Sequence, residues 1–145
     1  MSANIVVEFP SEYKYLNLVD LVCSEIIDEM DFKHEAANEI SISVIEACTN
    51  ALEHGNRCCP EENVHVVFSM QPDKLLIEVW DHGEGFDFED YLKHIPDPTD
   101  IHKQRGRGIY IMERMMDSLR FEMLPGGGMK VQLEKSLPKA GSRIA

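Results

Sequence analysis

The sequence predicts an α+β fold, a two-layer α/β sandwich in which helices cover one face of a mostly antiparallel sheet. Three observations predict it. Strand and helix patterns follow one another in the order strand, helix, helix, strand, strand, helix, strand, strand. Short turns rich in glycine and proline join two of the strand pairs, which favours hairpins. The chain has 145 residues, the size of one domain, and we expect residues 1–145 to form a single one.

The first half of the chain carries one expected strand and two expected helices. A strand rich in Ile and Val is expected at residues 4–9. Ser11 is predicted as the N-cap of the first helix. The apolar residues of this helix recur at spacings of three and four, which gives one buried face: Tyr15, Leu18, Val19, Val22, Ile26, Ile27 and Met30. A second helix is expected from about His34 to about Gly55, a glycine that acts as a C-terminal stop.

The second half carries four expected strands and a third helix. The strands form two hairpins, at residues 64–70 with 74–80 and at residues 119–124 with 129–137. The helix is expected from Ile109 to Met116, with Gly106 and Gly108 at its entrance. The stretch of about residues 86 to 105 is polar and shows no period. A connection of this length inside a small domain is more often a functional lid than a linker.

Charge and composition exclude several classes of function. A net charge of −12 argues against a nucleic-acid-binding protein, because a phosphate backbone needs a basic footprint, and against docking on an anionic membrane. It leaves nucleotide binding open, since backbone N–H groups, a divalent cation and a few local positive charges suffice. One local concentration exists: His102, Lys103, Arg105 and Arg107. No signal peptide and no apolar run of membrane-spanning length is visible, so we expect a cytoplasmic protein.

Neither the cysteines nor the histidines show the spacing of a metal site. The cysteines are Cys23, Cys48, Cys58 and Cys59, and no zinc pattern fits them. Cys23 and Cys48 fall on apolar helix faces, where we expect small, buried, reduced side chains. The histidines without ligand spacing are expected at ordinary surface or helix positions: His34, His65 and His94.

The second helix carries a polar stripe apart from its apolar face. At 100° per residue, the side chains of this stripe cluster on one side: Glu46, Asn50, Glu53, His54 and Arg57. Glu46 and Asn50 are an i, i+4 pair. A carboxylate and a carboxamide so placed can hold a magnesium ion and polarise an attacking hydroxyl. Taken alone, the stripe is explained equally well as the solvated face of an amphipathic helix.

Two glycine motifs follow the expected strand and precede the expected third helix. Asp81-His82-Gly83-Glu84-Gly85 ends a strand in an acid, which can accept from an exocyclic amine, while the glycines let the backbone approach a flat ring. Arg105-Gly106-Arg107-Gly108 enters a helix, where exposed N–H groups form an anion site. Each motif alone is also typical of an ordinary turn. No P-loop and no Rossmann motif occurs.

Together, in this order, the motifs resemble the three nucleotide-binding boxes of the GHKL ATPase superfamily. They are Glu46-x-x-x-Asn50 on a helix, Asp81-x-Gly83-x-Gly85 after a strand and Gly106-x-Gly108 before a helix. The resemblance covers nearly the whole chain, roughly residues 4 to 137. The string from Glu46 to Asn56, Glu-Ala-Cys-Thr-Asn-Ala-Leu-Glu-His-Gly-Asn, is most similar to bacterial anti-sigma-factor serine/threonine kinases.

The resemblance implies a role for each matched residue. Asp81 binds the adenine amino group of ATP or ADP, and Gly83 and Gly85 shape that side of the pocket. Asn50 ligates Mg²⁺ and Glu46 is the general base. Arg105, Gly106, Arg107 and Gly108 lie at the phosphates beneath the lid. The family usually has a threonine after its last glycine pair, where this chain has Met129.

The resemblance also implies a function and partners. It implies a protein kinase that phosphorylates a STAS-type anti-sigma-factor antagonist, holds a sigma factor inactive and forms a homodimer. Two alternatives remain, an ATP-dependent binding switch without kinase activity and an interaction domain that has kept only the fold. Glu46 and Asn50 weigh against the last, and no residue separates the first two. The short segment ahead of the second helix leads us not to expect a histidine kinase. The short segment after the last strand leads us not to expect a gyrase-type or chaperone-type ATPase, since these need a transducer domain.

Overall fold

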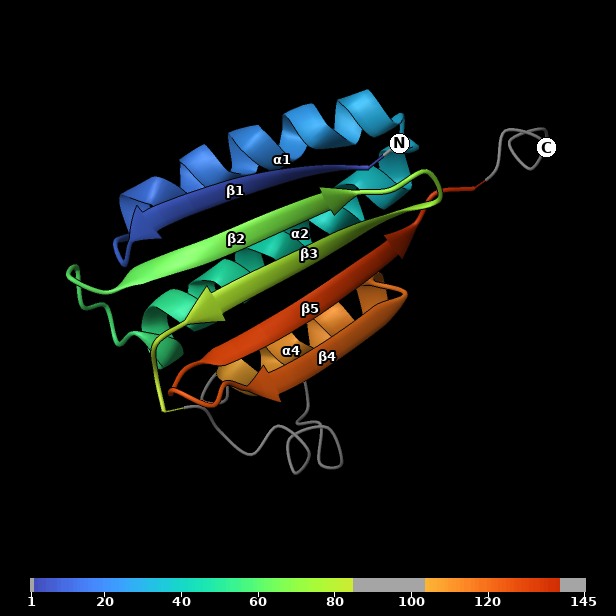
Figure 1. The fold of residues 1–145 in the computed structure, drawn as a ribbon. Coiled ribbons are helices and arrows are strands. Elements are labelled where there is room, and N and C mark those ends of the chain that lie inside the picture. The colour runs from blue at the N-terminus through green and yellow to red at the C-terminus, as the bar shows by residue number, and fades with distance from the viewer. Residues whose placement is uncertain (1, 85–103, 139–145) are drawn as a thin grey trace.

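Five antiparallel strands form one sheet in the computed structural model, which describes residues 2–84 and 104–138, with residues 104–107 described by their backbone alone. The strand order is β1-β2-β3-β5-β4, and each neighbouring pair is antiparallel. The strands are β1 (Ala3–Pro10), β2 (Asn63–Met70), β3 (Lys74–Asp81), β4 (Ser118–Met123) and β5 (Met129–Ser136). Figure 1 views the sheet from its open face, with α1, α2 and α4 behind it. The predicted two-layer α+β fold is confirmed.

The helices form the second layer. They are the short 3₁₀ helix η1 (Tyr13–Tyr15), α1 (Leu16–Met30), α2 (His34–Asn50), the π-helical turn η2 (Ala51–Gly55) and α4 (Gln104–Met115). Asp31 ends α1 in the left-handed conformation, with φ at 61°. The predicted second helix is confirmed to its stop at Gly55, although its last turn is a π-helix, a form that often occurs at functional sites.

The core lies between the sheet and the helices. In β2 and β3 every second residue is buried, because successive side chains of a strand point to opposite faces: Val64, Val66, Phe68, Leu75, Ile77 and Val79. The helices meet them with side chains that include Val19, Cys23, Ile40 and Val44. Each such apolar side chain stabilises the fold by about 1.5–3 kcal/mol through burial. This packing fixes α2 across the middle of the sheet.

Ser11 does not cap the first helix, and that prediction is wrong. Its hydroxyl donates to the carbonyl oxygen of Glu62 at 2.7 Å, and its backbone N–H donates to the same oxygen. The residue before η1 is Glu12, which makes no side-chain cap hydrogen bond. The Ser11 hydroxyl therefore binds a carbonyl oxygen distant in sequence, just before β2, and not an N–H group of the neighbouring helix.

The helix α4 begins earlier than the sequence predicted. It starts at Gln104, so Gly106 and Gly108 lie inside its first turns and not ahead of it. Glycine inside a helix costs only about 1 kcal/mol relative to alanine. The buried side chains of Ile109 and Met112, which pack α4 into the core, outweigh that cost.

Two of the four thiols are part of the core. Cys23 and Cys48 are buried, as predicted, and all four cysteines are free. Burial raises the pKa of the Cys23 thiol to about 12 and also raises the pKa of Cys48. Separately, none of the helices within residues 2–84 and 104–138 has the length and apolar character needed to span a membrane.

Candidate nucleotide-binding site

Asp81 ends β3 with its side chain on the helix side of the sheet, where it is only 8% exposed. A Cβ added to Gly55, at the end of η2, would lie 2.3 Å from the carboxyl carbon of Asp81. A Cβ on Gly128 would lie 2.3 Å from the carbonyl oxygen of Asp81, and Gly128 has φ at 101°, where other residues are strained. Gly55 therefore lies against the carboxylate of Asp81 and Gly128 against its backbone, both at distances that only glycine permits.

The loop after Asp81 is held by hydrogen bonds. The N–H of Gly83 donates to Oδ1 of Asp81 at 2.8 Å, and the carbonyl oxygen of Gly83 accepts from the N–H of Gly128. The N–H of His82 donates to Oδ1 of Asn56 at 2.7 Å, while Nδ2 of Asn56 donates to the hydroxyl of Ser11. The bond from Gly83 fixes the direction of the Asp81 side chain, and the bond to Asn56 holds the backbone of His82 in place.

A small cavity of about 20 Å³ lies beside Asp81, and this volume holds about one water molecule. Its walls are mostly apolar: Ala47, Ala51, Val79, Met112, Phe121, Met129 and Val131, with the polar Asn50 and Asp81. Met129 is the register partner of Asp81 on β5. It lies where the family's threonine was expected, and a thioether brings no hydroxyl to this wall.

A second, polar cavity of about 260 Å³ adjoins the first at Asn50. Its lining includes Glu46, Glu53 and His54 from α2 and η2, and Gly108 from α4. A Cβ on Gly108 would lie 2.9 Å from Oε2 of Glu46 and 3.3 Å from Nδ2 of Asn50. Glu46, Asn50, Glu53 and His54 therefore share one cavity, as their helical stripe predicted.

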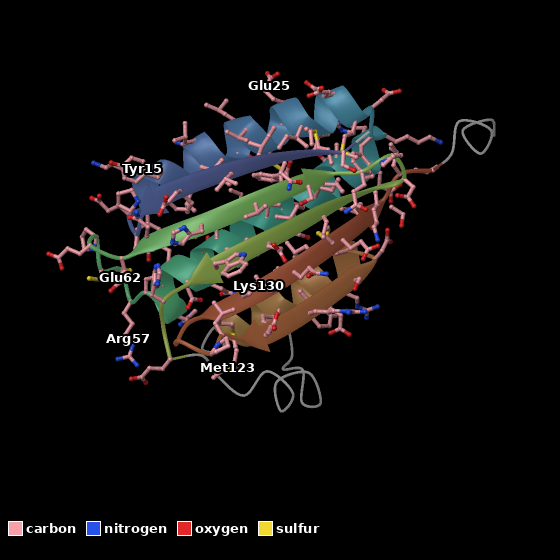
Figure 2. All side chains as sticks on the ribbon, in the orientation of Figure 1. Tyr15, Glu25, Arg57, Glu62, Met123 and Lys130 are labelled. Carbon is pink, nitrogen blue, oxygen red and sulfur yellow. The ribbon has the colours of Figure 1, made fainter. Side chains whose placement is uncertain are left out.

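Arg57 does not join that cavity, and its predicted place in the stripe is wrong. The helix ends at Gly55, and Arg57 and Cys58 both adopt left-handed conformations, with φ at 52° and 57°. The side chain of Arg57 extends away from the molecule, as Figure 2 shows, and lies 3.7 Å from the carboxylate of Glu84. The helical period predicts the direction of a side chain only within the helix, and Arg57 lies beyond its end.

Several predicted site residues lie outside the described residues or are described by backbone alone. Gly85 and nearly all of the predicted lid, from residue 86 to residue 103, lie outside them. Arg105, Gly106 and Arg107 are within α4 as backbone. The structure thus brings Glu46, Asn50 and Gly108 to one cavity and Asn50 and Asp81 to the neighbouring one. Gly83 lines neither cavity but donates its N–H to the Asp81 carboxylate.

Sequence reasoning assigned no role in the pocket to Gly55 or Asn56. Gly55 was expected only to stop a helix, yet it makes room for the Asp81 carboxylate. Asn56 is buried and links the loop after β3 to the end of β1. Both residues come at or directly after the end of the helix that carries Glu46 and Asn50. Their position in the sequence was the available signal, because residues at the end of a helix lie near the side chains of its last turns.

The two cavities have the chemistry of a nucleotide site. A buried acceptor beside close-packed glycines suits a flat ring with an exocyclic amine. Carboxylate and carboxamide oxygens are the ligands that Mg²⁺ prefers, which Glu46 and Asn50 supply. Among the described residues no group of three or more His, Cys, Asp or Glu side chains could hold a metal ion.

The chain is similar to known proteins over most of its length. The model of the histidine kinase-like ATPase domain family matches residues 9–135. The serine-protein kinase RsbW of Bacillus licheniformis is 32% identical over 138 residues, which cover 92% of this chain and 85% of the relative. The RsbW of Bacillus subtilis strain 168 is 28% identical over 123 residues, which cover 81% of this chain and 77% of the relative.

Two solved structures share the fold. The structure of the RsbU and RsbW domains of Rv1364c from Mycobacterium tuberculosis matches with a TM-score of 0.67 and 17% identity, covering 94% of this chain and 33% of that longer one. The SiaB–SiaC complex from Pseudomonas aeruginosa matches with a TM-score of 0.64 and 13% identity, covering 92% of this chain and 89% of the other. With its three motifs and the match over residues 9–135, this chain belongs to the family of histidine kinase-like ATPase domains, the GHKL type.

Proposed function

We propose that the chain is a single-domain, cytoplasmic serine/threonine protein kinase that uses ATP with Mg²⁺ and acts as an anti-sigma factor. One observation carries the proposal: Glu46 and Asn50 face one polar cavity beside Gly108, while the buried Asp81 closes the adjoining cavity. The naming of its relatives as serine-protein kinases supports the phosphotransfer.

The residues of the pocket divide the work between binding and chemistry. Asp81 accepts a hydrogen bond from the adenine amino group, and Asn50 holds Mg²⁺ next to the phosphates. Glu46 accepts the proton of a serine or threonine hydroxyl while the hydroxyl oxygen bonds to the γ-phosphorus and ADP leaves. Gly108 keeps the space between Glu46 and Asn50 open, since a Cβ there would meet both side chains.

A groove of about 410 Å³ between α1 and α2 gives a protein substrate access to this chemistry. Glu46 lines both the groove and the polar cavity. The groove wall also contains the apolar side chains of Leu16, Ile42 and Ile45. Exposed apolar side chains in a groove next to a catalytic carboxylate suit a partner that inserts an apolar side chain near its acceptor hydroxyl.

The partners follow from the family resemblance. We propose that the substrate is a STAS-type anti-sigma-factor antagonist, and that a sigma factor is the second partner, released when the antagonist binds. A homodimer belongs to the same proposal. Phosphorylation adds about two negative charges to the antagonist, which would repel the acidic surface of this chain and complete the exchange.

The test is transfer of the γ-phosphate. The chain is incubated with Mg²⁺-ATP and the STAS-domain proteins of its own organism, and intact mass reports a gain of one phosphate. Glu46→Gln is expected to lower transfer by about 100-fold or more while nucleotide affinity is retained. Glu53→Gln is the matched control, since Glu53 lines the same cavity but its Oε2 accepts from the hydroxyl of Tyr13 at 2.7 Å.

Two outcomes would overturn parts of this proposal. Wild-type transfer in Glu46→Gln would remove the general base. ATP-dependent binding of partners without transfer to any of them would make the chain a binding switch that lacks kinase activity.

A further inference from the structure

The open face of the sheet carries a pair of histidines at its end nearest the nucleotide site. His65 on β2 is the register partner of Trp80 on β3, and His82 follows Trp80 by two residues. Residues two apart in an extended strand point to the same face, so both imidazoles lie on the side opposite the helices. Their Nε2 atoms are 3.1 Å apart, and the rings meet edge to face at 72°.

A carboxylate sets the tautomer of one ring. Oε1 of Glu8 on β1 lies 3.2 Å from Nδ1 of His65 and also accepts from Nδ2 of Asn63 at 3.4 Å. The neutral His65 ring therefore carries its proton on Nδ1 and turns the lone pair of Nε2 toward His82. A carboxylate on the far nitrogen is the arrangement that orients metal-binding histidines and raises their basicity.

We propose that His65 and His82 form a binding site for a divalent transition-metal ion of the zinc or nickel class. An ion about 2.0–2.1 Å from each nitrogen separates the nitrogens by about 2.9–3.4 Å, for angles between octahedral and tetrahedral. The observed 3.1 Å lies within this range. Since no group of three or more ligating side chains exists among the described residues, water completes the coordination.

The surroundings leave room for a hydrated ion. A cavity of about 330 Å³ opens on this face, and its walls include His65, His82, Val67 and Trp80. Without metal, Nε2–H of His82 donates to Nε2 of His65. With metal, both Nε2 lone pairs bind the ion and the neutral His82 ring carries its proton on Nδ1. Imidazole ligands select zinc, nickel or copper over magnesium, so this site is chemically distinct from the oxygen ligands at Asn50.

The indole of Trp80 provides the measurement. It is the chain's one tryptophan, and it lines the same cavity as the histidine pair. Nickel chloride is titrated into the untagged full-length chain, stripped of metal, with Cys58 and Cys59 changed to Ser so that thiols do not compete. We expect saturable quenching of the indole fluorescence with one nickel ion per chain, and zinc chloride should give the same stoichiometry by calorimetry.

Variants locate the ion. His65→Gln and His82→Gln should each abolish the saturable quenching, and Glu8→Ala should weaken nickel binding by about 10- to 100-fold, the usual effect of losing a carboxylate behind a ligating histidine. His34→Gln, which changes a histidine at the start of α2, should bind nickel as the parent does. Asn50→Ala should also bind as the parent does, because the nucleotide cavity takes no part.

Three results would overturn the proposal: quenching that does not saturate, quenching that survives in both His65→Gln and His82→Gln, or quenching that is lost in Asn50→Ala. If the histidine variants do not fold, the parent protein still decides the question. Zinc should then shift the imidazole carbon-bound proton resonances of His65 and His82 in NMR spectra and leave those of His34 in place. Unshifted resonances for His65 and His82 would contradict the site.

Discussion

Gly55 and Asp81 lie 26 residues apart in sequence, yet a Cβ at position 55 would stand 2.3 Å from both Cγ and Oδ2 of the Asp81 carboxylate. The end of η2 therefore packs directly on the acid that ends β3, as Figure 1 shows for the ends of α2 and β3. This contact couples the shape of the nucleotide pocket to a residue that touches no nucleotide in the proposed mechanism.

We expect Gly55→Ala to lose most of the ADP affinity of the parent. A methyl group has no space beside the carboxylate, so either Asp81 or η2 must shift, and hydrogen bonds to a charged group are worth about 1.5–3 kcal/mol. Calorimetry with ADP and Mg²⁺ measures the loss. Gly126→Ala is the matched control, because a Cβ there meets nothing within 4 Å. Equal ADP affinity in both variants would contradict the importance of the contact.

Asp81→Asn should weaken ADP binding by about 1–3 kcal/mol, which is about 5- to 150-fold. The amide can still accept from the N–H of Gly83 through its oxygen. Its NH₂ group then faces the adenine amino group, so a donor meets a donor. Calorimetry with ADP and with GDP is the measurement, and unchanged ADP affinity in a folded variant would remove Asp81 from base recognition.

Asn50→Ala should weaken both Mg²⁺-dependent nucleotide binding and phosphate transfer, because an open coordination position remains on the ion. Thr49→Ala is its control. Thr49 lines the same cavity, but its hydroxyl donates to the carbonyl oxygen of Ile45 at 2.7 Å. Nucleotide affinity measured with and without Mg²⁺ separates the two effects. A Mg²⁺ dependence that stays at the parent's level in Asn50→Ala would exclude Asn50 as a metal ligand.

Ile42→Asp should raise KM for the protein substrate while leaving ADP affinity unchanged. Ile42 is 43% exposed in the groove next to Glu46. Packing an apolar side chain of the substrate against a carboxylate at this position would desolvate the charge, which is unfavourable. Glu25→Gln is the control, because Glu25 points outward from α1 in Figure 2. Steady-state phosphorylation and calorimetry together make the measurement. Parent-like KM in Ile42→Asp would move the docking surface away from this groove.

The free energy of unfolding should fall as pH rises above about 8.5. An unfolded thiol titrates near pH 8.5, whereas burial raises the pKa of Cys23 to about 12 and raises that of Cys48 as well. The folded state then binds more protons than the unfolded state, so this stability is fully present below about pH 8.5 and is lost toward about pH 12. Each thiol contributes a slope of up to about 1.4 kcal/mol per pH unit.

Urea unfolding at several pH values between about 8 and 10.5 measures this slope. Cys48→Ala should lower stability overall, because it leaves a cavity, and should also give a shallower pH dependence. A slope identical to that of the parent would show that Cys48 does not contribute to it.

The elements of the fold could be predicted because each rests on a local pattern. Alternation in Val64 to Phe68 marks a strand with one buried face, and spacings of three and four from Val19 to Ile26 mark a helix. The positions of Ser11 and Arg57 could not be predicted in this way. The partner of Ser11 is Glu62, 51 residues away, and Arg57 lies beyond the helix end at Gly55, in a left-handed conformation that a helical period does not describe.

The sequence by itself determined that Glu46 and Asn50 share one face, because residues four apart in any α-helix are neighbours. It also placed Asp81 at the end of a strand. Only the tertiary structure decided that Gly55 presses on Asp81, that Asn56 holds the backbone of His82, and that His65 and His82 meet. These contacts depend on strand register and on how α2 crosses the sheet. Both result from packing between segments distant in sequence, and such packing produces no periodic pattern in the sequence.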